Sequence, residues 1–262
     1  MFKYKVSVVV ISLNTRNDFL KTIKSIFSQS FTKYEVIIID GGSTDGTVEE
    51  IFKIKNKNVK YIVKKDRGIY YAMNKGIKLC RGEWVYFLNS GDIFYNKNIL
   101  KKIFVHKLNN SDIIYGNTII NAHNLFYLSV GNEFNKNTVL MPFCHQSCMI
   151  KSEILKKNLF NIKYKLSSDF NLLFKLYLSK KIFLKINEIF SLVDGTGVSN
   201  SNRQRVLSEN IKTLKELSFI KNVYKLYILK LNEFFKSLIK FFLPNFIIKI
   251  FIQLKYYKSI IK

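Results

Sequence analysis

The chain has 262 residues, of which 48% are hydrophobic and 23% charged, and this composition is too apolar for intrinsic disorder. Two prolines and eleven glycines exclude a collagen-like chain, and three cysteines exclude a disulfide scaffold. The formal net charge of +25 favours an anionic partner such as a lipid surface, a phosphorylated ligand or nucleic acid. A compositional bias towards Lys, Ile, Asn and Phe is the alternative explanation of this charge.

The first ninety residues alternate between buried strands and amphipathic helices. Continuous apolar runs, rich in β-branched residues, predict strands over residues 6–13, 34–40, 59–63 and 84–88. Apolar side chains at helical spacing predict helices over residues 18–28 and 69–79, and a capping box over Thr47–Glu50 predicts another helix. This alternation predicts an α/β fold with a mostly parallel central sheet and helices on both of its faces.

The next hundred residues are less regular. Short apolar runs predict strands over residues 113–115, 125–130 and 147–150, and residues 182–193 are also expected to be extended. Residues 168–178 have helical spacing, with Ser167 or Ser168 near the N-cap.

The composition changes at Arg203. Residues 203–262 contain thirteen basic and three acidic residues, with lysines spaced among Phe, Leu, Ile and Tyr, and Pro244 divides the segment into two helices. A basic amphipathic helix of this kind suits an anionic membrane surface; the alternative is a helix packed on the preceding domain with its lysines in water. We therefore expect a catalytic domain over residues 1–202 and a basic amphipathic helical extension over residues 203–262.

The sequence contains no apolar run long enough to cross a bilayer. The basic and apolar N-terminus resembles a signal peptide, but a polar turn follows in place of a cleavage site. We expect a cytoplasmic protein, peripheral on the inner face of the cell membrane.

Three aspartates follow predicted strands. Asp40 closes the second strand, Asp66 follows the third and Asp92 lies just past the fourth. Ligands of open parallel sheets bind beyond these carboxyl ends, and carboxylates there suit a divalent metal or the hydroxyls of a ribose. Each is also an ordinary turn residue. The glycine-rich turn over residues 41–46 matches neither a P-loop nor a dinucleotide-binding motif, which disfavours kinases, ATPases and dehydrogenases.

Seven segments occur in an order that resembles the family 2 glycosyltransferases, whose fold is called GT-A. The similarity covers about residues 5–200 and is greatest to enzymes that build bacterial capsule, exopolysaccharide and O-antigen chains. The segments are Val6–Asn14, Ser25–Phe31, Glu35–Thr47, Asp66–Gly76, Gly82–Asp92, Pro142–Ser147 and Ser168–Leu173.

The resemblance implies inverting transfer of a sugar from a nucleotide-sugar donor to a hydroxyl of a polysaccharide or lipid-linked acceptor. Asp40 matches the first acid of the family's nucleoside-binding turn, whose second acid is Gly41 here, and Ile11 and Leu13 stand where members often have Thr and Tyr. The residues expected to bind the nucleotide-sugar are Ser12, Asp40, Asp66, Arg67, Asn74, Lys75 and Asn89.

Asp92 matches the last acid of the family's metal motif, which reads Asn89-Ser90-Gly91-Asp92 here and keeps one carboxylate. We expect Mg²⁺ or Mn²⁺, held mostly by the diphosphate, to offset the charge of the leaving group. Asp169 matches the catalytic base, and a carboxylate in the first turn of a helix suits that role; a helix-capping aspartate is the alternative. His145 and Gln146 are expected to contact the acceptor or the diphosphate.

Two other functions are compatible with the composition. A nucleic-acid-binding protein agrees with the charge and with fifteen tyrosines, but no nucleic-acid-binding motif is recognisable, so we expect no such partner. A catalytically inactive membrane-surface scaffold agrees with the reduced metal motif, because a fold alone does not guarantee chemistry. The enzymatic hypothesis requires Asp40, Asp92 and Asp169 to lie around one bound sugar-diphosphate.

Overall fold

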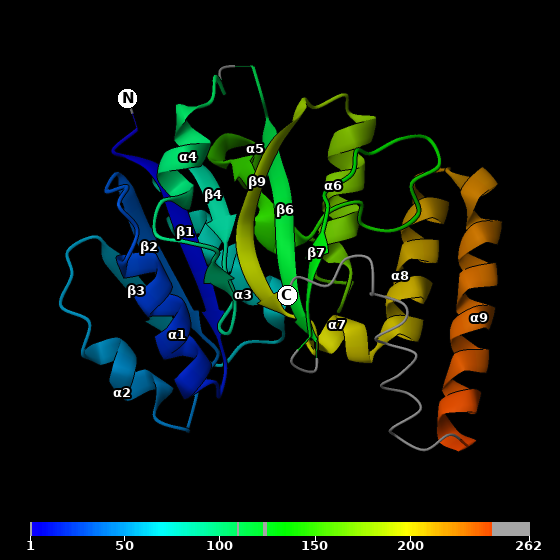
Figure 1. Ribbon diagram of the computed structural model, residues 1–262, viewed down its shortest axis with the longest axis horizontal. Coiled ribbons are helices and arrows are strands. Elements are labelled where there is room, and N and C mark those ends of the chain that lie inside the picture. Colours follow the sequence, from blue (N-terminus) through cyan, green and yellow to red (C-terminus); the bar gives the residue numbers. More distant parts are fainter. Residues whose placement is uncertain (1, 109, 123–124, 243–262) are drawn as a thin grey trace.

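A computed structural model of the chain describes residues 2–108, 110–122 and 125–242 (Figure 1). Within them, nine strands form one sheet in the order β3-β2-β1-β4-β8-β6-β9-β5, and β7 pairs with β6. The strands are β1 (Tyr4–Ser12), β2 (Tyr34–Asp40), β3 (Val59–Val63), β4 (Gly82–Phe87), β5 (Ile93–Phe94), β6 (Ile113–Ala122), β7 (Leu125–Ser129), β8 (Cys148–Lys151) and β9 (Phe183–Asp194).

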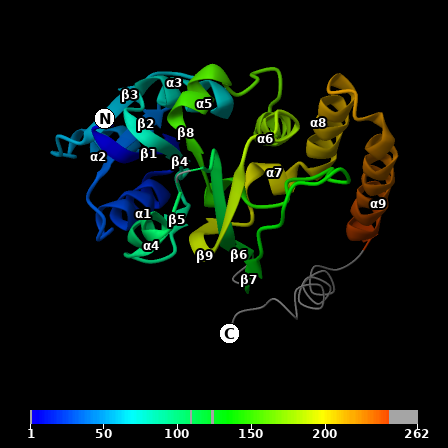
Figure 2. The same cartoon turned by 90° about the horizontal axis from the view of Figure 1, so that it is seen from above.

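Helices cover both faces of this sheet (Figure 2). The helices are α1 (Arg16–Phe27), α2 (Thr47–Phe52), α3 (Ile69–Leu79), α4 (Ile99–Val105), α5 (Ser152–Lys157), α6 (Ser168–Leu178), α7 (Val198–Ser201), α8 (Arg203–Glu216) and α9 (Val223–Phe242). The arrangement confirms the predicted α/β architecture of the GT-A type, with one half of the sheet parallel and the other half mixed.

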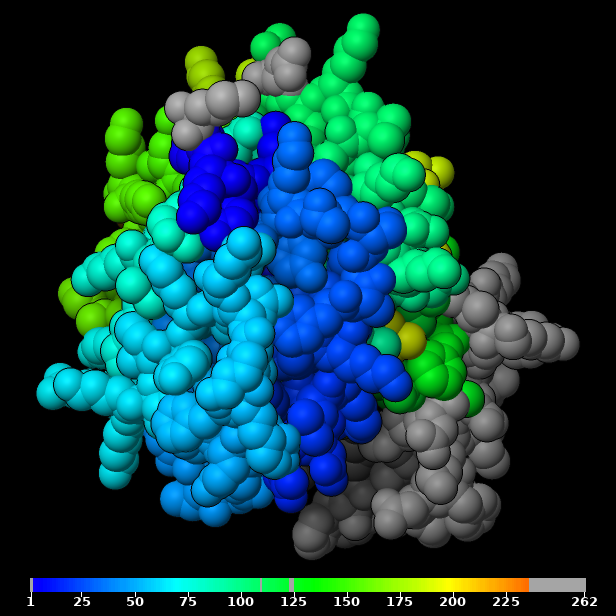
Figure 3. Space-filling view, turned by 90° about the vertical axis from the view of Figure 1, so that its left-hand side faces the viewer, coloured from blue at the N-terminus to red at the C-terminus, as the bar shows by residue number. Residues whose placement is uncertain are grey.

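The parallel half comprises β3, β2, β1 and β4, which pair in that order. Successive side chains of a strand point to opposite faces, so Val8 and Val10 pack with α1 and α4 in one cluster, whereas Val9 packs with α3, α5 and α6 in another. Burial on both faces explains why these strands read as continuous apolar runs. Figure 3 views the molecule from the edge formed by β3, where N-terminal residues build the surface.

Helix α2 begins at Thr47, as predicted, but without the predicted capping box. The N-cap is Gly46, in the left-handed region at φ +92°, and no side chain caps the helix. Asp45 accepts hydrogen bonds from the backbone N–H and the hydroxyl of Thr47, at 3.1 and 2.6 Å, while Glu50 pairs with Arg16 at 2.5 Å. The predicted capping box is therefore wrong, because both of its side chains have other partners.

Helix α8 and the start of α9 pack against the α/β unit. Leu207, Ile211 and Leu214 of α8, with Val223 and Leu226 of α9, belong to the same buried cluster as α3 and α6. Residues on both sides of position 202 therefore contribute to one buried cluster, and the division into a catalytic domain and a helical extension stays a prediction. The helical segment is already divided between α8 and α9, before the division predicted at Pro244; Pro244 and the helix predicted after it lie outside the described residues. In the described part of the chain, no helix has the length and apolarity that a membrane span needs.

Candidate active site

The site is built where β1, β2 and β4 end. The register pairs Ser12 with Asp40 at the last positions of β1 and β2. The chain beyond β4 continues over the end of β1, because the backbone N–H of Ser90 donates to the carbonyl of Ile11 at 3.0 Å. Three of the segments singled out in the sequence therefore meet at one edge of the sheet.

Asp40 organises the turn that follows β2. One of its carboxylate oxygens accepts hydrogen bonds from the backbone N–H groups of Gly42 and Ser43, at 2.9 and 2.7 Å, and the other accepts from the Ser43 hydroxyl at 2.6 Å. Gly42 lies at φ +91°, a conformation that L side chains rarely adopt. Asp40 is fully buried, so the observed contacts are those of a turn-forming residue, and its predicted contact with the nucleoside stays a prediction.

A chain of hydroxyl groups joins the ends of β1 and β4. Thr15 lies 3.1 Å from Ser12 and donates to Ser90 at 2.8 Å, measured between side-chain oxygens. An open hollow of about 400 Å³ begins at Thr15 and extends along the start of α1 to Asp45. Thr15 and Ser90 had no predicted role; each is a polar residue three positions after the end of β1 or β4.

Two buried polar atoms near this edge have no hydrogen-bond partner in the described part of the chain: Oδ2 of Asp66 and Oδ1 of Asn89. The other carboxylate oxygen of Asp66 forms an ion pair with Lys75 at 2.6 Å, and Arg67 beside it is exposed. An unsatisfied buried acceptor costs about 1–3 kcal/mol. Both atoms therefore suit a ligand that brings hydrogen-bond donors or a cation.

Asn74 has a different environment from the other predicted donor-binding residues. Its amide nitrogen donates to the carbonyl of Phe160 and its amide oxygen accepts from the Phe160 backbone N–H, both at 2.9 Å. These bonds fasten the loop after α5 to α3. The contact of Asn74 with a nucleotide-sugar stays a prediction.

Asp92 is buried, with 6% of its surface exposed. Burial raises its pKa to about 7, and a hydrogen bond from the side chain of Gln146 opposes this rise. The described residues contain no group of three His, Cys, Asp or Glu side chains arranged to hold a metal. The Asp92 carboxylate and the unpaired Asn89 oxygen nevertheless fit Mg²⁺ or Mn²⁺, since such ions take further ligands from water and substrate phosphates.

Asp169 lies in the first turn of α6. The Tyr70 hydroxyl, from the first turn of α3, donates to Oδ1 of Asp169 at 3.1 Å. Burial, and then the charge of Asp169, raises the pKa of Tyr70 well above its ordinary value. Tyr70 lies in the segment Asp66–Gly76 but had no predicted role. Its contact with Asp169 joins positions 99 residues apart, which local sequence patterns do not predict.

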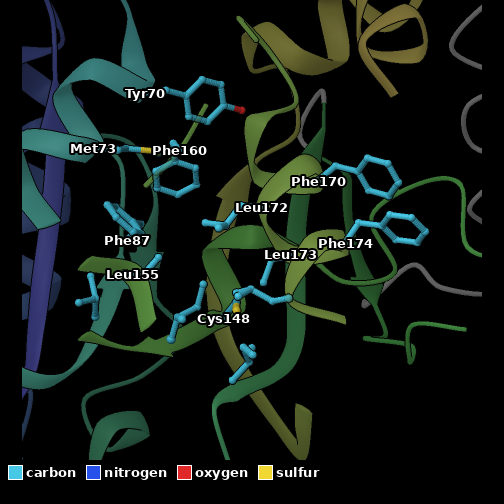
Figure 4. Packing of buried hydrophobic residues seen from close by; sticks show 14 of the residues in the cluster. Tyr70, Met73, Phe87, Cys148, Leu155, Phe160, Phe170, Leu172, Leu173 and Phe174 are labelled. Atoms are coloured by element: carbon cyan, nitrogen blue, oxygen red, sulfur yellow. The ribbon is translucent and has the colours of Figure 1, made fainter. Parts of the chain in front are cut away.

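His145 packs on an aromatic residue that also contacts Tyr70. Its ring stacks on Phe87 with centroids 5.5 Å apart and meets Phe160 edge-on at 5.9 Å. Figure 4 shows Phe87 and Phe160 with Tyr70 at one end of this buried cluster. Burial lowers the pKa of His145, and the charge of Asp169 opposes that change, so the imidazole is neutral at pH 7.

The segment from Cys144 to Gln146 links the two acidic centres. Burial raises the pKa of the Cys144 thiol to about 12, with smaller contributions from the charges of Asp92 and Asp169. Gln146 contacts Asp92, and His145 is within electrostatic reach of Asp169. The structure therefore brings Asp92 and Asp169 to the same segment, and the end of β1 connects this region to the turn at Asp40.

A mixed sheet of this strand order with flanking helices is a fold of the GT-A type. The family model "Glycosyl transferase family 2" matches residues 7–175, and the chain therefore belongs to this family.

Similar proteins agree with this assignment. An uncharacterized glycosyltransferase of Rickettsia felis is 32% identical over 167 residues, which are 60% of this chain and 27% of that protein. A PGL/p-HBAD biosynthesis glycosyltransferase of Mycobacterium tuberculosis is 27% identical over 63% of this chain and 66% of its own length. The match thus spans about a quarter of the Rickettsia relative and two thirds of the mycobacterial one.

Solved structures show the same fold at low sequence identity. S. aureus TarS 1-349 in complex with UDP-GlcNAc has a TM-score of 0.62 and 20% identity, covering 80% of this chain and 66% of that chain. The mannosyltransferase PcManGT from Pyrobaculum calidifontis, in complex with GDP-Man and Mn²⁺, has a TM-score of 0.65 and 14% identity over 86% of this chain and 69% of its own.

Proposed function

We propose that this protein transfers a sugar, with inversion, from a nucleotide-sugar donor to a hydroxyl of a polysaccharide or lipid-linked acceptor in cell-surface glycan biosynthesis. The observation that carries the proposal is the arrangement of Asp169 with Tyr70 and His145, near the segment that also contacts Asp92. The names of the relatives support the same class of reaction.

The donor is proposed to bind along the edge formed by Ser12, the Asp40 turn and Asp66. The unpaired Oδ2 of Asp66 suits a ribose hydroxyl, which brings the missing donor. Arg67 and Lys75 place positive charge beside it, which suits the diphosphate.

Asp169 acts as the general base of this reaction. Inverting displacement needs a carboxylate that accepts the acceptor proton as the oxygen attacks the anomeric carbon. The bond from Tyr70 at 3.1 Å fixes one oxygen of Asp169 and leaves the other for the acceptor hydroxyl. His145, held neutral by burial, has both a donor and an acceptor nitrogen for substrate hydroxyls, and Gln146 steadies Asp92.

Asp92 and Asn89 would hold Mg²⁺ or Mn²⁺ together with the diphosphate. When bound, such an ion stabilises the negative charge of the leaving nucleoside diphosphate as a Lewis acid. Gln146 and the backbone around Asn89 hold the Asp92 carboxylate in place for this role.

The acceptor is proposed to be reached at an anionic membrane surface on the cytoplasmic side. Six large apolar side chains of α9 are between 51% and 59% exposed, and lysines lie among them. This combination suits the boundary between headgroups and acyl chains. The apolar residues are Tyr224, Tyr227, Ile228, Leu231, Phe234 and Phe235.

A nucleotide-release screen tests the reaction. The purified chain is incubated with common sugar nucleotides and Mg²⁺ or Mn²⁺, and the released nucleoside diphosphate is measured. Asp169→Asn is expected to keep the fold and nucleotide binding but to lower turnover by about 10²–10⁴-fold. Turnover by that variant at the wild-type rate contradicts the base assignment, and nucleotide binding without turnover of any donor favours the scaffold.

A further inference from the structure

We propose that Glu209 of α8 is a positioning residue that sets the first turn of α6, and with it Asp169, for the reaction. The inference rests on the proposed function and adds to it a part of the chain beyond the matched family region, which ends at residue 175. It assigns the C-terminal helices a role in the chemistry itself.

The carboxylate of Glu209 gathers the backbone that leads into α6. It accepts hydrogen bonds from the backbone N–H groups of Lys165, Leu166 and Ser167 at 2.9–3.1 Å, and from the Ser167 hydroxyl at 3.3 Å. Oε2 takes part in four of these five contacts, so one oxygen organises most of the turn. Asp169 follows two residues after Ser167.

These bonds replace the usual cap of the helix. Ser167 is the N-cap of α6, yet its side chain makes no capping hydrogen bond to α6, and its hydroxyl donates to Glu209 instead. The glutamate side chain is 13% exposed, and hydrogen bonds to an ionised acceptor in such surroundings are stronger than neutral ones. The path of residues 165–167 therefore depends on a side chain 42 to 44 positions away.

Helix α8 is well placed to hold this carboxylate still. Leu207, Ile211 and Leu214 are buried in the core, and the hydroxyl of Thr213 accepts a hydrogen bond from the Asn171 amide of α6 at 3.2 Å. Glu209 therefore projects from a fixed helix onto the start of another. A base displaced by about 1 Å can lose about 100-fold in rate, so this support affects catalysis as well as stability.

Removal of the Glu209 carboxylate should affect the kinetics differently from a general loss of structure. Of the proposed donor-binding residues, Asp40 ends β2 and Asp66 follows β3, and Glu209 bonds instead to Arg205 and to residues 165–167. Removing Glu209 should therefore lower kcat while leaving the KM for the donor within about twofold. Glu209→Ala should lower kcat by about 100-fold, whereas Glu209→Gln, which keeps one acceptor oxygen, should lower it by about tenfold.

Glu216 provides a matched control on the same helix. It lies two turns further along α8 and accepts a hydrogen bond from the Tyr164 hydroxyl at 2.8 Å, but it does not bond to the backbone before α6. Glu216→Ala should leave kcat within about twofold. Amide hydrogen exchange supplies a readout without substrate: Glu209→Gln should increase exchange at residues 165–169, and Glu216→Ala should not.

The assays measure UDP release from UDP-GlcNAc and GDP release from GDP-mannose, using whichever donor the wild-type chain consumes. A selective fall in kcat, graded from Gln to Ala, supports the positioning role. Wild-type kcat in Glu209→Ala, or equal losses in Glu209→Ala and Glu216→Ala, overturns it. If Glu209→Ala does not fold, the kcat and the amide exchange of Glu209→Gln decide whether the positioning role holds. If the wild-type chain releases neither nucleotide, the proposed function is refuted for these two donors. If the wild type is active and Asp169→Asn is inactive, the proposed function stands, and an unchanged kcat in Glu209→Ala then refutes only the role of Glu209.

Discussion

Single carboxylates in this protein hold a turn or the start of a helix in place. Asp40 satisfies three donors within its own turn, and Glu209 satisfies the backbone before α6. Asp92 differs, because burial raises its pKa to about 7 and its negative charge is therefore held at a free-energy cost. Such a cost is typical of a residue kept for binding or chemistry.

This cost gives a pH-dependent prediction for Asp92→Asn. Between about pH 4 and pH 7 the folded protein keeps a proton on Asp92 that the unfolded chain has released, so the free energy of unfolding falls as the pH rises through this window. The change from 3.8 to about 7 corresponds to about 4 kcal/mol. Asp92→Asn should therefore be more stable than the wild type at pH 8 and similar at pH 4.

Urea unfolding at both pH values, without divalent metal, measures this difference. Glu153→Gln changes an exposed carboxylate and is the control. A stability difference for Asp92→Asn that is the same at pH 4 and pH 8 would show that the buried charge is not its source.

At this scale, the positions of the acids in the sheet could be predicted from the sequence better than their hydrogen-bond partners. Asp40, Asp66 and Asp92 follow recognisable strands, so their common edge follows from parallel-sheet geometry. The contacts of Asp169 with Tyr70 and of Glu209 with Ser167 join positions 99 and 42 residues apart. Local periodicity carries no information about such pairs, because only the tertiary packing brings them together.

At the scale of elements, the strongly periodic segments were predicted well. The observed bounds of β2, β3, α3 and α6 equal the predicted ranges, because the two strands are β-branched apolar runs followed by turn residues and the two helices are long enough to show helical spacing. The short elements β5, α4 and α5 were not predicted, since two to seven residues are too few to show a period.

Close packing between α3 and β1 gives a prediction at this scale. A Cβ atom added at Gly76 would lie 2.5 Å from Cγ1 of Val9, so Gly76→Ala must push the helix away from the sheet. Overpacking of this kind costs about 1–3 kcal/mol, although alanine favours helices. We expect a lower urea midpoint and reduced donor turnover, because α3 carries Tyr70 and Lys75.

Gly197→Ala serves as the control for this variant. Its added Cβ would meet no atom closer than 3.6 Å, so its midpoint should stay near that of the wild type. An unchanged midpoint for Gly76→Ala would show that the contact relaxes without cost.

At the scale of the whole molecule, α8 and α9 contribute to the core and to the start of α6 on one side and expose apolar side chains on the other. Helix α8 lies between the α/β unit and α9 (Figure 1), contributing Leu207 and Leu214 to the core and Glu209 to the start of α6. Helix α9 buries Val223 and Leu226 and exposes six large apolar side chains between Tyr224 and Phe235. One helix pair thus connects the proposed membrane contact to the proposed base.

The final prediction tests that membrane contact. Ile228 and Leu231 are each 55% exposed on α9, so Ile228→Asp with Leu231→Asp should leave the core intact while removing apolar area and adding negative charge. We expect cosedimentation with phosphatidylglycerol vesicles to weaken by at least about tenfold, because apolar burial and attraction to anionic lipid both decrease. Val105→Asp, at a 77% exposed position on α4, should bind as the wild type does. Equal binding of phosphatidylcholine and phosphatidylglycerol vesicles by the wild type would contradict the electrostatic part of the proposal, and unchanged binding of the double variant would contradict the role of α9.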